Sequence, residues 1–514
     1  MERIYLKLEV LAKAGDCQLI RGKTDCEITA LTEDSRQAEK GAMFFCIKGC
    51  LTDGHDYADD AVFRGASAIV CDREISLPAD CTTAVLMTDD VRKAMGAMAS
   101  AFYGWPHREL ITVGVTGTKG KTTTTFMIKK ILDEAGIKTG LIGTVVTDTG
   151  KDILKSDHTT PDSIRLHRYL REMASNGCKA AVIEVSSQAL KLSRTEPVIF
   201  DYGVFTNIEE DHISPFEHKD FAEYASCKAR LFRRCGIGLV NGDDPNIELI
   251  TKNASCRLRT FGFEPGNDLR AESLYTVRLP GALGSEFRLR GKDFDTGVVL
   301  GMPGKFNCSN AMAAISTALL MGVPEQTASA ALQKISVPGR QEMFALDAGR
   351  LIMVDYAHNG TGLKQLLTSL REYRPSRVTC VFGCGGNRDF GRRKAMGEAA
   401  AKYADRIIVT SDNPRNEQPQ AIINDIITEI EKYNTPFQVI EDRGQAIEEA
   451  VRSCVPGEIA AICGKGHEDY QILGDEIIHF DDREQVLASI EKVRNEQNYN
   501  CGNQRGYGRT NSVR

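Results

Sequence analysis

The residues with the clearest chemical meaning lie in the stretch Val113-Gly-Val-Thr-Gly-Thr-Lys-Gly-Lys-Thr-Thr-Thr-Thr125. An apolar, β-rich run ends at Val115, a glycine turn follows, and a helix-like run then extends to Glu134. A strand, a glycine loop and a helix in this order predict a phosphate-binding loop, because backbone N–H groups converge on phosphate oxygens there. A lysine adds positive charge, and a threonine hydroxyl can reach Mg²⁺. The predicted nucleotide-binding residues are Gly117, Thr118, Lys119, Gly120, Lys121, Thr122 and Thr123.

The glycine spacing of this loop differs from the common form G-x-x-x-x-G-K-[ST]. The first glycine of that form would fall on Val115, whereas Gly114 lies one position earlier. The alternative is an ordinary turn that enters a helix. The strand before the loop and the helix after it favour the phosphate-binding interpretation.

Polar clusters also follow two later apolar strands, Ala180 to Val185 and Tyr202 to Thr206. Glu184-Val-Ser-Ser187 offers a carboxylate and hydroxyls to a hard cation, although a helix N-cap explains the serines about as well. Thr206-Asn207 with Asp211-His212 is either a ligand cluster or a capped loop, and the sequence leaves both open. Lys228 lies in a helix-like run, where a lone lysine is usually solvated. The residues themselves do not distinguish it.

The last third of the chain places polar or glycine-rich segments at four strand ends. These segments are Asp355–His358, Gly383–Asp389, Ser411–Arg415 and Gly464–Glu468. Open α/β sheets bind ligands at the carboxyl ends of their strands. We therefore expect a cleft for a zwitterionic substrate, with arginines for carboxylates and Glu468 for an ammonium group.

The elements that must position these residues predict an α/β protein of three domains. Residues 1–106 form a small N-terminal α/β domain, with strands at Met43–Ile47, Ala68–Cys71 and Ala84–Met87 and a helix at Val91–Tyr103. Residues 107–337 form a central doubly wound, mostly parallel sheet that carries the phosphate loop, with an antiparallel excursion over 253–302. Residues 338–494 alternate strand and helix as a Rossmann-like domain. The tail, 495–514, has few apolar residues and is predicted to be disordered.

Composition narrows the class of protein. The formal net charge of −6 gives no electrostatic reason to expect a nucleic-acid partner. No apolar run approaches the roughly 20 residues of a membrane span, and the N-terminus does not resemble a signal peptide, so a cytoplasmic protein is expected. The 16 cysteines lack zinc-ligand spacing. Several lie within apolar strands, where a thiol serves as a small hydrophobe: Cys46, Cys71, Cys380 and Cys463.

These motifs, in this order over roughly residues 25 to 490, resemble the Mur ligases of peptidoglycan synthesis. The resemblance implies an N-terminal domain for a uridine nucleotide, a central ATPase domain and a C-terminal domain for an amino acid. It implies that Glu184 and His212 bind Mg²⁺ together with Thr122, and that Lys228 is carbamylated and also serves as a metal ligand. Lys121, Glu184, His212 and Lys228 would be the catalytic residues. Asn307, Asn310 and Arg340 would contact ATP.

The resemblance also implies which residues bind the other substrates. Ser35 in Asp34-Ser35-Arg36 would contact the uridine nucleotide, and Thr159, Thr160, Ser186 and Arg194 the muramoyl dipeptide. The amino-acid site would comprise Arg388, Asp412, Asn413, Pro414, Arg415, Gly464 and Glu468. In the family, the form Asp-Asn-Pro-Arg accompanies meso-diaminopimelate, whose distal carboxylate can pair with Arg415. Lysine lacks that carboxylate and would leave the arginine without a partner.

The implied reaction is ATP-dependent amide formation on the D-Glu carboxylate of UDP-MurNAc-L-Ala-D-Glu, through an acyl phosphate. Small-molecule substrates and a monomer are expected. The alternatives are the same reaction with L-lysine or another diamino acid, a sibling ligase such as a folylpolyglutamate synthetase, and a non-catalytic ligase-like nucleotide-binding protein. The chain departs from the family pattern at Gln188, where His is usual, and in a longer segment between His212 and Lys228.

Overall fold

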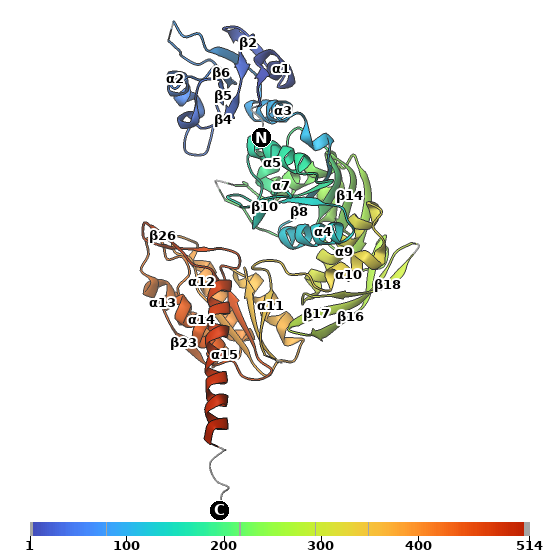
Figure 1. Cartoon of the computed structure of the whole chain (residues 1–514), viewed down its shortest axis with the longest axis vertical. Helices are drawn as coiled ribbons and strands as arrows, with labels where there is room; N and C mark the ends of the chain where they lie inside the picture. The colour runs from blue at the N-terminus through green and yellow to red at the C-terminus, as the bar shows by residue number, and fades with distance from the viewer. Residues whose placement is uncertain (1–3, 79, 215–216, 293, 348, 508–514) are drawn as a thin grey trace, which may run out of the picture. The chain divides into compact units, whose positions relative to one another are not determined.

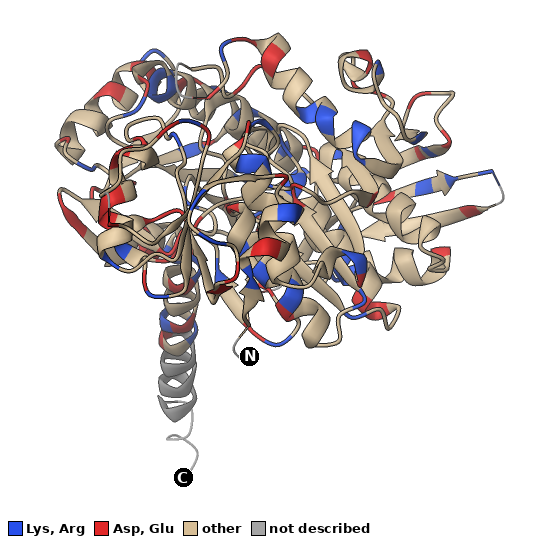
Figure 2. Ribbon diagram, turned by 90° about the horizontal axis from the view of Figure 1, so that it is seen from above, with Lys and Arg blue, Asp and Glu red and all other residues tan. Residues whose placement is uncertain are grey.

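The computed structural model describes residues 4–507 apart from 79, 215–216, 293 and 348 (Figure 1). The chain forms two compact units. The first comprises residues 1–270, 290–294 and 309–328, and the second comprises 271–289, 295–308 and 329–514. Basic and acidic residues are interspersed along the described chain (Figure 2). Within the part that the structure describes, none of the helices combines the length and the apolar character that crossing a membrane requires.

The N-terminal region contains a five-stranded sheet. Its order is β2 (Gln18–Arg21), β7 (Ala84–Met87), β6 (Ala68–Cys71), β5 (Ala42–Phe45) and β4 (Ala30–Thr32). Strands β4 to β7 run parallel, and β2 pairs antiparallel at the edge. The expected strands are therefore present within a residue or two. The accompanying elements are β1 (Leu6–Lys7), β3 (Glu27–Ile28), α1 (Leu8–Ala14), α2 (Ala58–Phe63), α3 (Val91–Phe102), and the 3-10 helices η1 (Ser35–Gln37), η2 (Gly54–Tyr57) and η3 (Pro106–Arg108).

The central sheet has eleven strands in the order β11-β10-β9-β12-β8-β13-β14-β15-β16-β17-β18. Strand β8, which leads into the phosphate loop, lies between β12 and β13, and all three run parallel. The carboxyl ends of these strands therefore meet at one edge of the sheet, as the doubly wound prediction requires. The strands are β8 (Ile111–Thr116), β9 (Thr139–Ile142), β10 (Val146–Asp148), β11 (Ile153–Lys155), β12 (Ala180–Glu184), β13 (Phe200–Phe205) and β14 (Cys235–Asn241). The helices are α4 (Lys121–Glu134), α5 (Ser163–Ser175), α6 (Ser187–Lys191), α7 (Phe221–Ala229), η4 (Arg230–Arg233), α8 (Ile247–Thr251), α9 (Lys305–Leu320) and α10 (Glu325–Leu332).

The first part of residues 253–302 differs from the antiparallel excursion that the sequence predicts. Strand β15 (Arg257–Gly262) pairs parallel with β14, and the start of β16 (Leu269–Leu279) pairs parallel with β15. Helix α8 connects β14 to β15. A crossover of this kind returns the chain to the edge of the sheet where β14 began, so that β15 can run parallel to it. The parallel sheet therefore continues into this segment before β17 (Ala282–Arg290) and β18 (Asp295–Leu300).

The C-terminal sheet has six strands in the order β19-β20-β24-β21-β22-β23. All neighbours run parallel except β19, which pairs antiparallel with β20. Strand β24 is the last of the parallel strands in the sequence, yet it lies between the first two. The strands are β19 (Glu342–Asp347), β20 (Arg350–Asp355), β21 (Val378–Phe382), β22 (Arg406–Val409), β23 (Phe437–Val439) and β24 (Ile459–Cys463), with a separate hairpin of β25 (Tyr470–Leu473) and β26 (Glu476–His479). The helices are α11 (Gly360–Arg371), α12 (Phe390–Tyr403), α13 (Pro419–Ile430), α14 (Arg443–Arg452) and α15 (Asp482–Tyr507).

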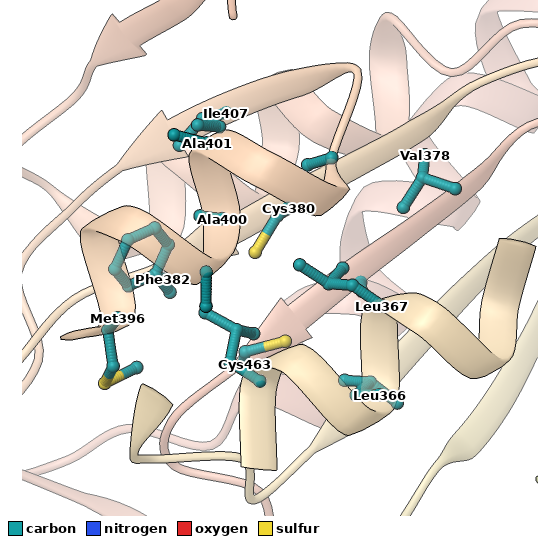
Figure 3. Packing of buried hydrophobic residues seen from close by; sticks show 14 of the residues in the cluster. Leu366, Leu367, Val378, Cys380, Phe382, Met396, Ala400, Ala401, Ile407 and Cys463 are labelled. Atoms are coloured by element: carbon teal, nitrogen blue, oxygen red, sulfur yellow. The ribbon is translucent and has the colours of Figure 1, made fainter. Parts of the chain in front are cut away.

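Helices cover both faces of this sheet. Successive side chains along a strand point to opposite faces, so each strand contributes to a core on either side of the sheet. Val378, Cys380 and Phe382 of β21 pack in one core with α11, α12 and α13, and part of this core is shown in Figure 3. Val381 of the same strand packs in the other core with α14 and α15. The thiols Cys46, Cys71, Cys380 and Cys463 are fully buried, as predicted, and they form no disulfide.

The C-terminus differs from the sequence prediction of a disordered tail from residue 495. Helix α15 continues to Tyr507, while residues 508–514 lie outside the described residues. The helix is anchored where Val486, Ile490 and Val493 pack into the core. Once a helix is nucleated, each further residue adds a hydrogen bond without a new nucleation cost. A polar composition alone therefore does not end it.

A buried ion pair connects α14 to the start of α15. The Arg443 guanidinium donates from Nε and Nη2 to the two carboxylate oxygens of Asp482, both at 2.7 Å, and both side chains are fully buried. The same guanidinium donates to the backbone carbonyls of Ser411 (3.4 Å) and Cys463 (3.0 Å). The pair thus fixes the ends of β22 and β24, directly before Asp412 and Gly464.

Replacing Asp482 by Asn should leave the Arg443 charge buried without a counter-charge. We expect the free energy of unfolding of Asp482→Asn to fall by about 3–5 kcal/mol, the usual cost of breaking a buried pair from one side. Denaturant unfolding measures it. The matched control is Glu398→Gln, which breaks the exposed pair between Glu398 and Lys402 on α12 and should change stability little. An equal loss of unfolding free energy in the two variants would show that the buried pair contributes no more to stability than the exposed one.

Candidate functional site

Two glycines give the phosphate loop its conformation. Gly117 and Gly120 have φ angles of 153° and 84°, which favour glycine. A Cβ atom at Gly117 would lie 1.9 Å from Oγ1 of Thr206, and one at Gly120 would lie 2.4 Å from Oδ1 of Asn310. The loop therefore needs glycine at both positions for backbone conformation and for space. Asn310 lies beside the loop, where the sequence places a nucleotide contact.

Two residues directly after β13, Thr206 and Asn207, form hydrogen bonds with the phosphate loop. The Thr118 amide donates to the Asn207 carbonyl (2.9 Å), and the Lys119 amide donates to Oδ1 of Asn207 (3.0 Å). The hydroxyl of Thr206 donates to the Lys119 carbonyl at 2.6 Å. Thr206 and Asn207 therefore hold the phosphate loop in place through these hydrogen bonds.

Glu184 is a fully buried carboxylate at the end of β12. It accepts hydrogen bonds from Oγ1 of Thr122 (3.0 Å), from Oγ1 of Thr144 (3.0 Å) and from the Thr144 backbone N–H (2.8 Å). A Cβ at Gly143 would approach its Oε1 to 2.3 Å. A carboxylate and a threonine hydroxyl held together at the start of α4 match the donor preference of Mg²⁺. Thr144 belongs to no recognisable motif, so its contact with Glu184 is visible only in the structure.

Lys228 and Lys121 share one acceptor. Nζ of Lys228 donates to the Gly117 carbonyl at 2.8 Å, and Nζ of Lys121 donates to the same carbonyl at 2.9 Å and to that of Thr118 at 3.1 Å. Lys228 is 1% exposed. Burial lowers the pKa of its amine well below the ordinary value, and the charge of Lys121 lowers that pKa further, against the opposite effect of Asp211. Lys228 is therefore a buried amine with a lowered pKa beside the phosphate loop, unlike a solvated helical lysine.

Tyr224, one helical turn before Lys228 on α7, joins the loop to this lysine. Its hydroxyl lies 2.9 Å from Oγ1 of Thr118, and its ring centroid lies 4.5 Å from Nζ of Lys228. The ring also packs near the rings of His212 and His218. The i, i+4 spacing places both side chains on one face of α7. The i, i+4 spacing of Tyr224 and Lys228 is the sequence feature that could have indicated this contact. A tyrosine in an amphipathic helix, however, is more often simply a residue of the hydrophobic core.

A cavity of about 170 Å³ gathers many of the predicted residues. It is lined by Lys121, His158, Thr159, Thr160, Ser186, Ser187, Gln188, Arg194, His212, Glu217 and Lys228. Nη1 of Arg194 donates to the Thr160 carbonyl (2.9 Å), and the Thr160 hydroxyl donates to the Glu184 carbonyl (2.7 Å). The cavity therefore combines the lysine of the phosphate loop with residues predicted to bind an acceptor substrate. Gln188, the departure from the family pattern, also lines it.

The predicted metal ligands are brought together only in part. Thr122 contacts Glu184, while His212 and Lys228 line the cavity. Among the described residues, no group of three or more His, Cys, Asp or Glu side chains gathers to hold a metal ion. Ser35 is buried in η1, and none of the described hydrogen bonds joins its side chain to the cavity. Its role stays a prediction.

In the second unit, residues after β20 and β24 form a cluster around Arg340. Nη1 of Arg340 lies 3.1 Å from Nδ1 of His467, and its guanidinium carbon lies 4.4 Å from the centroid of the Tyr356 ring. Asn307 is held by hydrogen bonds from its Nδ2 to Oε1 of Gln341 (2.6 Å) and to the Pro303 carbonyl (2.8 Å). These contacts hold the side chains of Arg340 and Asn307, for which the family resemblance implies contacts to ATP.

The predicted amino-acid site is assembled at the ends of β21, β22 and β24. Nδ2 of Asn413 donates to Glu468 Oε2 (3.1 Å), and Nη1 of Arg415 donates to the Gly386 carbonyl (2.8 Å). A Cβ at Gly464 would lie 3.0 Å from Asp412, and one at Gly386 would meet the Pro414 carbonyl at 1.9 Å. Arg388 is exposed in the loop before α12.

Lys465 was missed by sequence reasoning. It is fully buried, and its Nζ lies 3.4 Å from both Glu468 Oε2 and Asn413 Oδ1. Burial raises the pKa of Glu468 above its ordinary value. The positive charge of Lys465 lowers this pKa, and the negative charge of Asp412 raises it. The charge of the Glu468 carboxylate is therefore offset in part by the buried lysine. Its position between two glycines in Gly464-Lys-Gly466 was the only local signal.

Models of three protein domains match the chain. A Mur ligase family, catalytic domain matches residues 27–103, a Mur ligase middle domain matches 115–318, and a Mur ligase, glutamate ligase domain matches 339–466. Together these ranges cover most of the sequence.

Individual relatives are similar over almost the whole chain. A UDP-N-acetylmuramoyl-L-alanyl-D-glutamate–2,6-diaminopimelate ligase from Clostridium botulinum is 38% identical, with 95% of this chain and 100% of the relative covered. The protein of the same name from Listeria monocytogenes is 38% identical over 95% and 99%. A solved structure with that name matches with a TM-score of 0.70 and 28% identity, covering 96% of this chain and all of the other. A Mycobacterium tuberculosis folylpolyglutamate synthase, at 17% identity and a TM-score of 0.58 over 72% of this chain and 91% of its own, shares the fold.

The space beside Gly120 yields a test of the loop. In Gly120→Ala the new Cβ would collide with Asn310 and strain a left-handed residue, so we expect ADP affinity to fall by at least about tenfold, or ~1.4 kcal/mol. Isothermal titration calorimetry measures it. The matched control is Gly136→Ala, since Gly136 also has a left-handed φ (79°) but has no atom within 4 Å of the added Cβ. Its ADP affinity should not change; a parallel loss there would mean that backbone strain alone explains the effect.

Proposed function

This chain belongs to the Mur ligase family, and we propose that it joins 2,6-diaminopimelate to UDP-N-acetylmuramoyl-L-alanyl-D-glutamate in an ATP-dependent, amide-forming reaction. The observation that carries the proposal is the cavity in which Lys121 of the phosphate loop, buried Lys228 and the polar residues Thr159, Thr160 and Arg194 meet. The substrates are those named for relatives that are similar along almost the entire chain.

The reaction first activates the acceptor. The D-Glu carboxylate attacks the γ-phosphate of ATP, which gives an acyl phosphate and ADP. Both reactants are anions, so positive charge must offset their repulsion. Lys121 is the residue for this role, because its Nζ already lies against the phosphate loop. Arg194, Thr159, Thr160 and Ser186 would orient the dipeptide in the cavity, and Ser35 in the N-terminal domain (residues 1–106) would contact the uridine nucleotide.

The second step forms the amide. The amine of diaminopimelate attacks the acyl phosphate, and inorganic phosphate leaves. Asn413, Asp412 and Glu468 would bind the ammonium and carboxylate groups of one end of the amino acid, and Arg415 and Arg388 the distal carboxylate. An arginine suits that task because its planar guanidinium pairs with carboxylates in two parallel hydrogen bonds.

The donor set near the phosphate loop fits Mg²⁺. Glu184 offers a carboxylate and Thr122 a hydroxyl at the N-terminus of α4, and His212 lines the same cavity as Lys121. When bound, the cation would screen the phosphate oxygens and draw charge from the transferring phosphoryl group. Hard cations prefer oxygen ligands, and the amine of Lys228 offers none.

A carbamate on Lys228 would supply that oxygen. The neutral amine reacts with dissolved CO₂, so that an N–C bond forms, one proton is released and the side chain ends in a carboxylate. Only an unprotonated amine can attack CO₂, and the lowered pKa of Lys228 favours that form. The modification would turn the amine that now donates to the Gly117 carbonyl into a carboxylate-like ligand, which would supply negative charge to a bound cation.

Removal of Lys228 tests the carbamate. We expect Lys228→Ala to lose activity by at least about 10²–10³-fold, the range seen when one group that stabilises transition-state charge is removed. Added acetate or formate should restore part of it. Lys219→Ala, which changes an exposed lysine just before α7, is the control and should keep full activity. Full activity in Lys228→Ala would sink the carbamate proposal.

A phosphate-release assay with UDP-MurNAc-dipeptide and a panel of amino acids tests the function as a whole. Diaminopimelate should support turnover, while lysine and glutamate should not. In Arg415→Ala the distal carboxylate loses its partner, and kcat/KM for diaminopimelate should fall by a factor equivalent to about 1–3 kcal/mol or more. Arg452→Ala on the surface of α14 is the matched control.

Each alternative has its own outcome in this assay. Equal turnover of lysine and diaminopimelate by the unchanged protein would favour a ligase of broader specificity. Turnover of a folate substrate with glutamate would favour the folylpolyglutamate reaction. Tight ADP binding without phosphate release from any acceptor would favour a non-catalytic nucleotide-binding protein.

A further inference from the structure

Glu217, which lies between His212 and α7 in the sequence, contacts His212. Backbone hydrogen bonds join Ser214 to His218 (3.0 Å) and His218 to His212 (3.2 Å). Nδ1 of His212 lies 3.0 Å from Oε1 of Glu217. Both side chains line the cavity with Lys121 and Lys228. The segment between His212 and Lys228 is the one whose length departs from the family pattern.

Contacts to α6 and α7 hold Glu217 in place. Its backbone carbonyl accepts from Nζ of Lys191 (2.7 Å), and the same Nζ pairs with Glu223 (3.1 Å). The next residue, His218, is 1% exposed, and its Nε2 lies 2.9 Å from the hydroxyl of Ser187. Hydrogen bonds therefore hold the backbone at Glu217 and the neighbouring His218 in place, whereas the residues of an exposed surface ion pair lack such contacts.

The contact with Glu217 decides which nitrogen of His212 is available. A carboxylate only accepts hydrogen bonds, so Nδ1 must carry the proton and Nε2 of the neutral ring keeps a lone pair. Metal-binding histidines commonly donate the other ring N–H to a carboxylate, which fixes the tautomer and ring orientation. His212 also has a φ of 58°, a left-handed conformation that is uncommon outside glycine and that the surrounding contacts must hold.

We propose that Glu217 is a positioning residue that holds His212 as the Nδ1–H tautomer, which leaves Nε2 as the ring nitrogen that can bind the cation of the proposed function. The inference rests on the proposed function for the presence of that cation. Glu217 acts through His212 and does not itself touch the reacting atoms. The alternative is an ordinary ion pair at the rim of the cavity, which would leave cation affinity unchanged.

Mn²⁺ binding provides a readout that does not depend on turnover. Electron paramagnetic resonance of free Mn²⁺, titrated into the full-length protein with ADP, gives the affinity. We expect Glu217→Ala to weaken it by about 10–100-fold, the usual effect of losing such a partner. Glu217→Gln keeps an acceptor oxygen but loses the charge, so it should fall between Ala and the unchanged protein. Glu210→Ala, an exposed glutamate just before His212, is the matched control.

The tautomer itself can be observed without metal. Imidazole ¹⁵N shifts of His212, identified by their absence in His212→Gln, should show a protonated Nδ1 in the unchanged protein and a shift towards the Nε2–H tautomer in Glu217→Ala. Unchanged Mn²⁺ affinity or an unchanged tautomer in Glu217→Ala would overturn the role of Glu217 alone. If the unchanged protein binds no more Mn²⁺ than ADP does by itself, the cation site of the proposed function fails, and this inference fails with it.

Discussion

The site depends on two lysine amines that converge on a single backbone carbonyl. Gly117 can present its oxygen to both because its backbone adopts a conformation that favours glycine and leaves no room for a side chain. The charge of Lys121 adds to the effect of burial in lowering the pKa of the Lys228 amine. A lower pKa favours the neutral form of an amine, which is the reactive form. The two lysines therefore differ in chemical character although they share one acceptor.

Parallel strands explain how so many motif residues reach the same place. Strands β12, β8 and β13 are neighbours, so Glu184, the phosphate loop and Thr206-Asn207 end at one edge of the sheet. The C-terminal sheet repeats the principle, and there the insertion of β24 between β20 and β21 brings Gly464 and Glu468 beside Asn413. The guanidinium of the Arg443–Asp482 pair donates to backbone carbonyls at the ends of β22 and β24 and so holds these two strand ends together.

Three carboxylates of this protein have different surroundings. Glu184 accepts hydrogen bonds from two threonine hydroxyls and a backbone amide. Oε2 of Glu468 lies 3.4 Å from Nζ of the buried Lys465. Glu217 is half-exposed, and its Oε1 lies 3.0 Å from Nδ1 of His212. The chemistry of each follows from its partners more than from its residue type, which is why motif identity alone does not assign it.

The sequence by itself determined the α/β class, the phosphate loop, most strand positions and the polar strand ends, because these depend on local periodicity and on residue types at short spacing. It did not determine the parallel pairing of β15, the continued helix α15, or the roles of Thr144, Tyr224, Lys465 and Glu217. It also could not tell a solvated Lys228 from a buried one. Only the tertiary structure decided these points, because contacts such as Gly117 with Lys228 join residues 111 positions apart. Which side chains meet at that separation depends on strand order and packing, and the local sequence encodes neither.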